Sequence, residues 1–491
     1  MNIHEDNLSL NQPKQLIEWA LSVGRTFQSK QTGFIHYHHG DVGNEGHQTI
    51  PFYENVLFAL ALFKSRLIDQ IQEGKELLNR LLGFQNKDGL FPAYLHEYPK
   101  CLDIAQGLQA LCPFYWILKK FGHILGIDLK TALEKSAYAL LKACFDQYNE
   151  KNLSYYLAVR LSASQVAFGI LLKDEKLKSD GERNLNSLAE HQLTDWYYTG
   201  QLGEMLVGLR MVYPSLKNTP WEPLWNHVVN TWHGDIGCYI GPNIREWYDK
   251  SEPKPSLYDL ILANDTEFFP ERLKTPQIYH LKGVLIDSIH SIDQLDEKES
   301  NVVRGSFQDQ KWEIHRFKDF SYNLLEKNHP PKPTTDKTFT PFMFIWKGKQ
   351  VNSFICQGGC YEKAFYQVQD QVIQLNFDLT PISPISEGDK RPEIEFFMNF
   401  QPDFQIQSNG LPSNTFELNQ PIQMKLGKHQ VILKFELIEG DGDFMLHFIR
   451  GNRPSETHLK GSDRFNSYDW TLFLRTIRRQ GPCKIRATIQ F

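Results

Sequence analysis

A change in hydrophobic periodicity near residue 270 constrains this chain more than any other feature. Before it, apolar side chains recur every three to four residues, the spacing that lines one face of a helix. After it, short runs rich in β-branched and aromatic residues alternate with polar ones, as in residues 483–491. Because helices and strands bury apolar residues at different periods, the sequence predicts a helical domain over 1–268 and a β domain over 269–491.

The helical half divides into a series of amphipathic segments. The clearest is 50–66, whose apolar face consists of Ile50, Phe52, Val56, Leu57, Leu60 and Phe63. Further helices are predicted at 13–29, 70–84, 101–118, 129–145, 154–173, 183–192, 196–212, 219–233 and 256–264. This series is typical of an array of stacked helical hairpins.

The second half contains short β-rich runs separated by turn-forming residues. The runs lie at 284–286, 311–317, 342–346, 366–377, 429–435 and 483–491. Clusters of Gly, Asn and Asp, such as 408–410 and 440–442, separate them. The pattern predicts about a dozen strands folded as an antiparallel β-sandwich.

Charge and targeting signals limit the partners of the chain. The formal net charge is −5 and the pI is near 6.4, which favours neither nucleic acid nor an anionic membrane as a partner. No run is apolar for long enough to predict a membrane span, and the first residues lack the segments of a signal peptide. We therefore expect a cytoplasmic protein, or a secreted one if a leader has been removed. The oligomeric state is left open.

Seven cysteines are scattered without paired spacing. The one close pair is Cys356 and Cys360, and nothing near it resembles a zinc-binding set. An odd, scattered set predicts reduced thiols, although whether Cys356 and Cys360 pair is left open.

Three connections in the helical half share a pattern. The loops at 33–49, 89–100 and 237–249 each begin with glycine and apolar residues, then become rich in aromatic residues, histidine or both. Alternate loops of a helical-hairpin array lie at the same end, so we expect these three to line a single cleft. The loop at 237–249 has a second interpretation, in which its aromatic residues only pack a domain junction.

The order of the two halves, together with Gly241, Pro242, Arg245 and Tyr248, resembles the heparinase II/III-like group. The resemblance implies an incomplete (α/α) toroid of helical hairpins followed by an antiparallel β-sandwich. It also implies the activity of a polysaccharide lyase on a poly- or oligosaccharide, with an acidic one as one option. The absence of a leader departs from the secreted lyases of that group.

Lyase chemistry assigns roles to three residues. Elimination across a uronic acid needs a group that neutralises the carboxylate, a base for the C5 proton and an acid for the leaving oxygen. Arg245 suits the first role because its guanidinium can contact a carboxylate at two points. Tyr248 and His47 are the candidates for moving the proton. Alternatives remain open: Arg245 could pair with Glu246, Tyr248 could pack at the junction, and His47 could only begin a helix.

Polar and aromatic residues in or near the loops are candidates for binding the sugar, by hydrogen bonds or by stacking. They are Asn243, Tyr53, Trp247, His96 and Tyr197.

Two other functions are compatible with the sequence. A glycoside hydrolase needs two carboxylates across the sugar, for which Glu97 and Asp103 are the first candidates and Asp88 and Asp41 the next. Asp103, however, lies in a first helical turn, where a carboxylate is favourable for structural reasons alone. The other function is a non-catalytic scaffold that binds carbohydrate or protein.

His36, His38, His39 and Asp41 are residue types that bind zinc. Their spacing matches no closed motif, so we expect no metal there. No phosphate-binding loop or nucleotide-binding fingerprint is present either, and we expect no cofactor.

Overall fold

The computed structural model describes residues 17–39, 47–150, 153–192, 199–233, 238–240, 280–285, 302–307, 310–326, 340–347, 351–356, 359–381, 392–398, 404–454 and 468–491. Contacts divide the chain into two compact units. The helical unit comprises Met1–Gln192, Tyr197–Asn226 and Tyr248–Asp296, and the β unit comprises Leu193–Trp196, His227–Trp247 and Glu297–Phe491. The chain therefore passes between the units more than once. The expected boundary between residues 268 and 269 lies outside the described residues.

Most described helices fall where the periodicity placed them, but three depart from the prediction. The run predicted at 101–118 is two helices, the helix predicted at 183–192 already begins at Glu175, and the helix His280–Gly283 was not predicted. Residues 17–27 are helical. The labelled helices are α2 Phe52–Lys64, α3 Ile68–Leu82, α4 Ile104–Gln109, α5 Leu111–Phe121, α6 Ile127–Glu150, α7 Tyr155–Leu172, α8 Glu175–Ala189, α9 Thr199–Arg210, α10 Glu222–Thr231, α13 His280–Gly283 and the single 3₁₀ turn η1 Leu95–Glu97. The helix expected at 256–264 lies outside the described residues.

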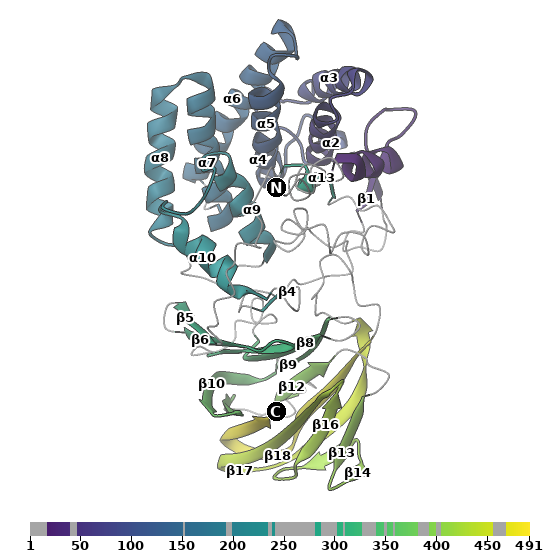
Figure 1. The fold of residues 1–491 in the computed structure, drawn as a ribbon, viewed down its shortest axis with the longest axis vertical. Helices are drawn as coiled ribbons and strands as arrows, with labels where there is room; N and C mark the ends of the chain where they lie inside the picture. The colour runs from purple at the N-terminus through teal and green to yellow at the C-terminus, as the bar shows by residue number, and fades with distance from the viewer. Residues whose placement is uncertain are drawn as a thin grey trace, which may run out of the picture. The chain divides into compact units, whose positions relative to one another are not determined.

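The helical unit has two rows of helices. Along one row α2 contacts α5, α5 contacts α7, and α7 contacts α9, while α3, α6 and α8 pack behind their neighbours in sequence (Figure 1). Burial explains the rows: almost all of α2 is buried, whereas α3 buries only Gly74, Leu77, Leu78 and Leu81. A helix apolar on all sides belongs inside, and an amphipathic one covers it. The helical-hairpin prediction is thus confirmed for this part of the chain.

The N-terminus of α8 is capped by Asp174, whose Oδ1 accepts a hydrogen bond of 3.0 Å from the Leu177 amide. We expect Asp174→Ala to lower the free energy of unfolding by about 1 kcal/mol, because that amide loses its partner. The measurement is urea denaturation. Asp180→Ala is the control, since Asp180 lies inside the same helix and only forms a surface pair with Arg183. Equal losses in both variants would contradict the capping role.

α7 is long enough, at 18 residues, and apolar enough to cross a membrane by length and composition. Such a helix was not expected from the sequence. In the structure 72% of the helix is buried inside the protein, which is the environment of a core helix.

Two short β-hairpins correct the expectation that the domain over 1–268 is helical throughout. β1 Tyr37–His39 pairs with β2 His47–Thr49, and β3 Trp232–His233 pairs with β4 Cys238–Tyr239. Strands of two or three residues show too few alternations to be recognised by period.

Over its described residues, the β unit is built around one antiparallel sheet of 14 strands. Its main path runs β14-β13-β16-β17-β18-β12-β9-β8-β7-β6-β5, with β10, β11 and β15 attached. The strands are β5 Val302–Phe307, β6 Gln310–Arg316, β7 Phe320–Leu325, β8 Phe342–Lys347, β9 Val351–Cys356, β10 Tyr361–Gln369, β11 Val372–Leu379, β12 Ile394–Met398, β13 Gln405–Ser408, β14 Leu411–Pro412, β15 Thr415–Glu417, β16 Ile422–Leu426, β17 His429–Pro454 and β18 Tyr468–Gln490.

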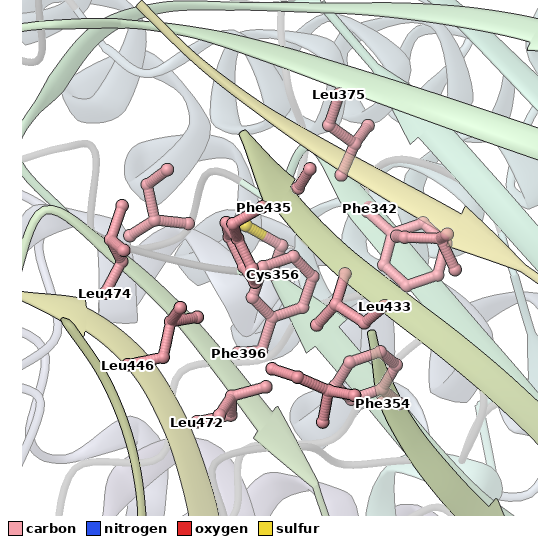
Figure 2. Close-up of a cluster of buried hydrophobic side chains, with 14 of the residues drawn as sticks. Phe342, Phe354, Cys356, Leu375, Phe396, Leu433, Phe435, Leu446, Leu472 and Leu474 are labelled. Atoms are coloured by element: carbon pink, nitrogen blue, oxygen red, sulfur yellow. The ribbon is translucent and has the colours of Figure 1, made fainter. Parts of the chain in front are cut away.

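A single hydrophobic core joins strands that are far apart in this order. Tyr322 of β7 and Met424 of β16 belong to one buried cluster, so the sheet must fold over to enclose it. Figure 2 shows part of the interior, where Phe342, Phe354 and Phe396 lie among leucines of β17 and β18. The two long strands make this possible, because each pairs with several partners along its length.

Two of the expected strands need correction. Residues 284 and 285 form a turn after α13, so the strand predicted at 284–286 is wrong for its described residues. The run at 366–377 is two strands, since the chain turns at Asp370, which has a φ of 55°. The predicted runs at 311–317, 342–346, 429–435 and 483–491 are confirmed as strands. Cys356 and Cys360 are both buried.

Candidate functional site

Two of the three predicted loops meet at the N-terminal end of α2. The Phe52 amide donates to Ala93 O at 2.9 Å, and the Leu95 amide donates to Ile50 O at 2.9 Å. These bonds tie the segment that leads into α2 to the loop at 89–100. Of the third loop, only residues 238–240 are described, and they belong to the β unit. The described parts of two loops therefore lie close together, and the single cleft stays a prediction.

Asn55 holds the first loop in place. This fully buried side chain accepts a hydrogen bond from the Ile35 amide at 2.8 Å and donates to Ile35 O at 3.1 Å and Pro51 O at 2.7 Å. A buried backbone group needs a partner, and here one amide side chain satisfies three of them.

Asn55→Ala should lower the free energy of unfolding by about 2 kcal/mol, because it leaves those buried groups without partners. The Ile35 amide should also exchange with solvent faster, which hydrogen exchange measures. The matched control is Asn184→Ala, which removes a single, long hydrogen bond of 3.4 Å to Gln165. Unchanged exchange at Ile35 would show that Asn55 does not hold the loop.

His96, a predicted sugar-binding residue, lies on η1 in the second loop. Its side chain is exposed, and its ring stacks on Tyr94 with centroids 5.8 Å apart and planes 12° apart. An exposed ring stacked on a partly buried one is suited to contact with a sugar ring. His47 pairs with His39 through the strand register.

The carboxylates of the hydrolase alternative are described as well. Asp103 accepts a hydrogen bond of 2.9 Å from the Ala105 amide at the start of α4, as its structural interpretation expects. Glu97 and Asp88 lie close enough to Cys101 to help burial raise the pKa of its thiol to about 11.

All four zinc-type residues lie in the first loop, and His36 is the one whose side chain the structure describes. His36 Nε2 lies 2.8 Å from Thr32 Oγ1, within hydrogen-bond distance. Among the described residues, no group of three or more His, Cys, Asp or Glu side chains is placed to hold a metal ion.

A buried polar cluster lies next to Tyr53, in the first turn of α2. Arg160 on α7 is 0% exposed and forms an ion pair with Glu204 on α9. Glu204 Oε1 also lies 2.9 Å from Lys282 Nζ on α13. Arg160 also donates to Gln109 O at 3.0 Å. Glycine at position 208 leaves space for the Arg160 side chain, since a Cβ there would lie only 2.9 Å from Arg160 Cγ. Three helices are therefore joined by charge inside an apolar unit.

Tyr53 belongs to this cluster, which corrects the expectation that it faces the cleft. Its side chain is 3% exposed, with Arg160 Cζ 6.0 Å and Lys282 Nζ 5.5 Å from the ring centroid. Burial raises the pKa of the Tyr53 phenol to about 12, and Arg160 opposes the shift. Burial lowers the pKa of Lys282 to about 8. At neutral pH Tyr53 is thus a neutral phenol.

Arg160 was not predicted from the sequence, although a signal was present. It is the only charged residue in the 18 residues of α7. A single arginine in an otherwise uncharged, apolar helix has to find a partner from another element, because an unpaired buried charge is too costly. The sequence therefore allows Arg160 to be recognised as a buried, paired charge, but it does not identify the residues that pair with it.

A second polar cluster in the β unit was also missed. Arg304 binds Glu313 through two contacts of 3.1 Å, and Glu313 contacts His315 Nε2. The His315 ring stacks on Tyr322 at 4.4 Å. Burial lowers the pKa of His315, and Glu313 opposes the shift. Arg304 and Glu313 are register partners, as are His315 and Tyr322, so cross-strand pairing accounts for the cluster.

Comparison with known proteins defines the fold. No protein-family model matches the chain, and no curated protein sequence does. Among solved structures, chondroitin AC lyase of Streptomyces coelicolor A3, in complex with chondroitin sulphate, matches over 98% of this chain and 79% of its own, with a TM-score of 0.52 and 11% identity. This chain shares its fold with that lyase. Heparan sulfate lyase HepC of Pedobacter heparinus matches over 97% and 82%, with a TM-score of 0.40 and 11% identity.

The resemblance expected from the sequence is thereby confirmed at the level of the fold. It does not test the remaining site residues. Tyr197, Asn243, Arg245, Trp247 and Tyr248 lie outside the described residues, and so does Asp41. Their roles stay predictions.

Proposed function

We propose that the chain is a lyase that cleaves an acidic polysaccharide by elimination next to a uronic acid. One observation carries the proposal: a likeness over 98% of the chain to a chondroitin AC lyase whose structure holds chondroitin sulphate. The two rows of helices and the enclosing antiparallel sheet support the finer architecture, an incomplete (α/α) toroid followed by a β-sandwich.

The chemistry assigns each group a task. Arg245 contacts the uronate carboxylate at two points and stabilises the charge that develops when the C5 proton leaves. Tyr248 or His47 removes that proton, the C4–oxygen bond breaks, and a double bond forms between C4 and C5. The departing oxygen takes up a proton. Asn243, Trp247, His96 and Tyr197 contact the sugars on either side.

Asp103 bears on the hydrolase alternative. Its carboxylate already accepts a hydrogen bond at the start of α4. Glu97 and Asp103 are therefore weaker candidates for the catalytic pair of a hydrolase than two carboxylates without such structural roles would be.

The test is to incubate the protein with chondroitin sulfate, hyaluronan and heparan sulfate. A lyase produces an unsaturated uronate, seen as ultraviolet absorbance, in step with new reducing ends. Reducing ends without absorbance would indicate a hydrolase. If neither product forms from any of the three, the lyase proposal is contradicted for these substrates. That result would favour the alternative of a non-catalytic binding scaffold.

A further inference from the structure

The C-terminal ends of α2, α5 and α9 meet on the helical unit. Phe63 of α2 stacks on Phe121 of α5, with ring centroids 5.7 Å apart. The Tyr115 hydroxyl of α5 donates to Met211 O, directly after α9, at 3.0 Å. The three ends are therefore held together by packing and by a buried hydrogen bond.

Five cationic side chains gather where these ends meet, and we call them the helix-end cluster. They are Lys64, Arg66, Lys119, Lys120 and Arg210. Arg66, Lys119 and Lys120 are exposed, while Lys64 and Arg210 are partly buried. Burial, followed by the charges of Lys64, Lys119, Arg210 and Arg66, lowers the pKa of Lys120 to about 8. Among the residues that the structure describes, the charged neighbours that shift the pKa of Lys120 are cations, in a protein whose formal net charge is −5. Lys64 Nζ also donates to Val284 O.

Aromatic rings position two of these cations. Lys119 donates to the Tyr115 hydroxyl at 2.7 Å. Lys119 Nζ and Lys120 Nζ lie 5.5 and 5.1 Å from the Trp116 ring centroid. Because these contacts restrict the long side chains, less rotational freedom is lost when the amines bind an anion.

Helix stability alone does not account for the cluster. A cation in the last helical turn is favourable through the helix dipole, but crowding five like charges costs free energy. Arg66 has a φ of 61°, a left-handed conformation that glycine adopts at least cost. Lys173 after α7 has the same conformation, with a φ of 58°, but is not among the charged neighbours that shift Lys120.

The helix-end cluster is separate from the loops of the candidate site. Those loops contact the N-terminal end of α2, whereas Lys64 ends that helix. At 1.5 Å per residue the two ends of this helix lie about 18 Å apart. The cluster therefore belongs to a different surface from the predicted cleft.

We propose that the helix-end cluster binds a sulfated polysaccharide, as a second contact for the polymer away from the predicted cleft. The choice of polysaccharide rests on the proposed function. A pI near 6.4 argues against a general nucleic-acid surface. Leu67 and Ile68, next to Arg66 in the chain, are 58% and 84% exposed. An anionic membrane surface is therefore the alternative ligand that the experiment must exclude.

The experiment measures binding of dextran sulfate, a polyanion without uronic acid that a lyase of uronates cannot cut. Arg66→Gly should weaken binding about fivefold, the effect expected for one cation at an anionic surface. Its melting temperature should stay the same or rise, because glycine relieves the left-handed backbone. The matched control, Lys173→Gly, makes the same backbone and charge change and should alter binding less than about twofold.

A second variant and a pH series complete the test. Lys120→Gln should weaken binding to a similar extent. Binding should also weaken as the pH rises from about 7 to 9, because burial lowers the pKa of Lys64 to about 7 and the pKa of Lys120 is about 8, and both amines lose their protons in this range.

Several outcomes would overturn the inference. These are no binding by the wild type, equal losses in Arg66→Gly and Lys173→Gly, or binding of neutral dextran at the same strength. A different result would favour a membrane as the ligand in place of a polysaccharide. In that case the protein would bind phosphatidylserine vesicles but not dextran sulfate, and Ile68→Ser would abolish the binding. Wild-type binding without lyase turnover would contradict the proposed function and leave the cluster's role standing.

Discussion

Replacing Arg160 with methionine should lower the free energy of unfolding by about 3–5 kcal/mol, the scale for breaking a buried ion pair from one side. Arg160 is fully buried, and Glu204 is only 14% exposed. Methionine fills much of the same space without charge, so the main loss is electrostatic. Glu204 would keep only Lys282, and Gln109 O would lose its donor. Urea denaturation measures the change.

Arg183→Met is the matched control. Arg183 pairs with Asp180 at 2.7 Å on the surface of α8, but its side chain is 74% exposed. Water and salt screen such a pair, so the same substitution should cost less than about 1 kcal/mol. The double variant Arg160→Met with Glu204→Gln should lose less than the sum of the single changes. Strict additivity would show that the two side chains do not stabilise each other.

Arg245→Lys should reduce lyase turnover by about a hundredfold or more, a scale typical of losing one transition-state donor. Lysine keeps the positive charge but offers the uronate carboxylate a single point of contact in place of two. The measurement is the initial rate of unsaturated product, compared at saturating substrate. A variant with unchanged turnover would remove Arg245 from the mechanism.

Two companion sets separate the lyase from the hydrolase. Tyr248→Phe removes only a hydroxyl, so the lyase mechanism predicts a normal fold with reduced activity. The hydrolase alternative predicts the reverse, in which Glu97→Gln or Asp103→Asn abolishes activity and Tyr248→Phe is tolerated. Intact activity in both sets would place the site elsewhere.

Periodicity and composition were enough to predict the elements whose apolar or β-rich pattern is uninterrupted. α2 and α7 follow from their apolar spacing, and β6 and β8 from their β-rich runs. Periodicity failed at the turn between β10 and β11, because residues 366–377 form one β-rich stretch, although Asp370 interrupts the apolar positions and the alternation changes phase at Val372 and Ile373. Asp370 occupies a conformation usually given to glycine, and no glycine or proline marks this turn.

The candidate site was predictable only where it depends on the order of the helices. Because alternate loops of a hairpin array share an end, two loops could be expected to meet, and the bonds of Phe52 and Leu95 show that they do. The surroundings of Tyr53 were not predictable. They depend on Arg160 and on Lys282, which lies beside a segment interpreted from its sequence as a strand.

The long strand β18 has a consequence for how the protein is made. Val372 of β11 and Ile432 of β17 both take Gln490 of β18 as their register partner, so residues early in the sheet depend on a segment more than fifty residues later. Contacts of such high sequence separation form slowly. During synthesis the ribosome must deliver nearly the whole β unit before the edges of β11 and β17 are covered. Until then, chaperones are the natural protection for these exposed edges against association with other nascent chains.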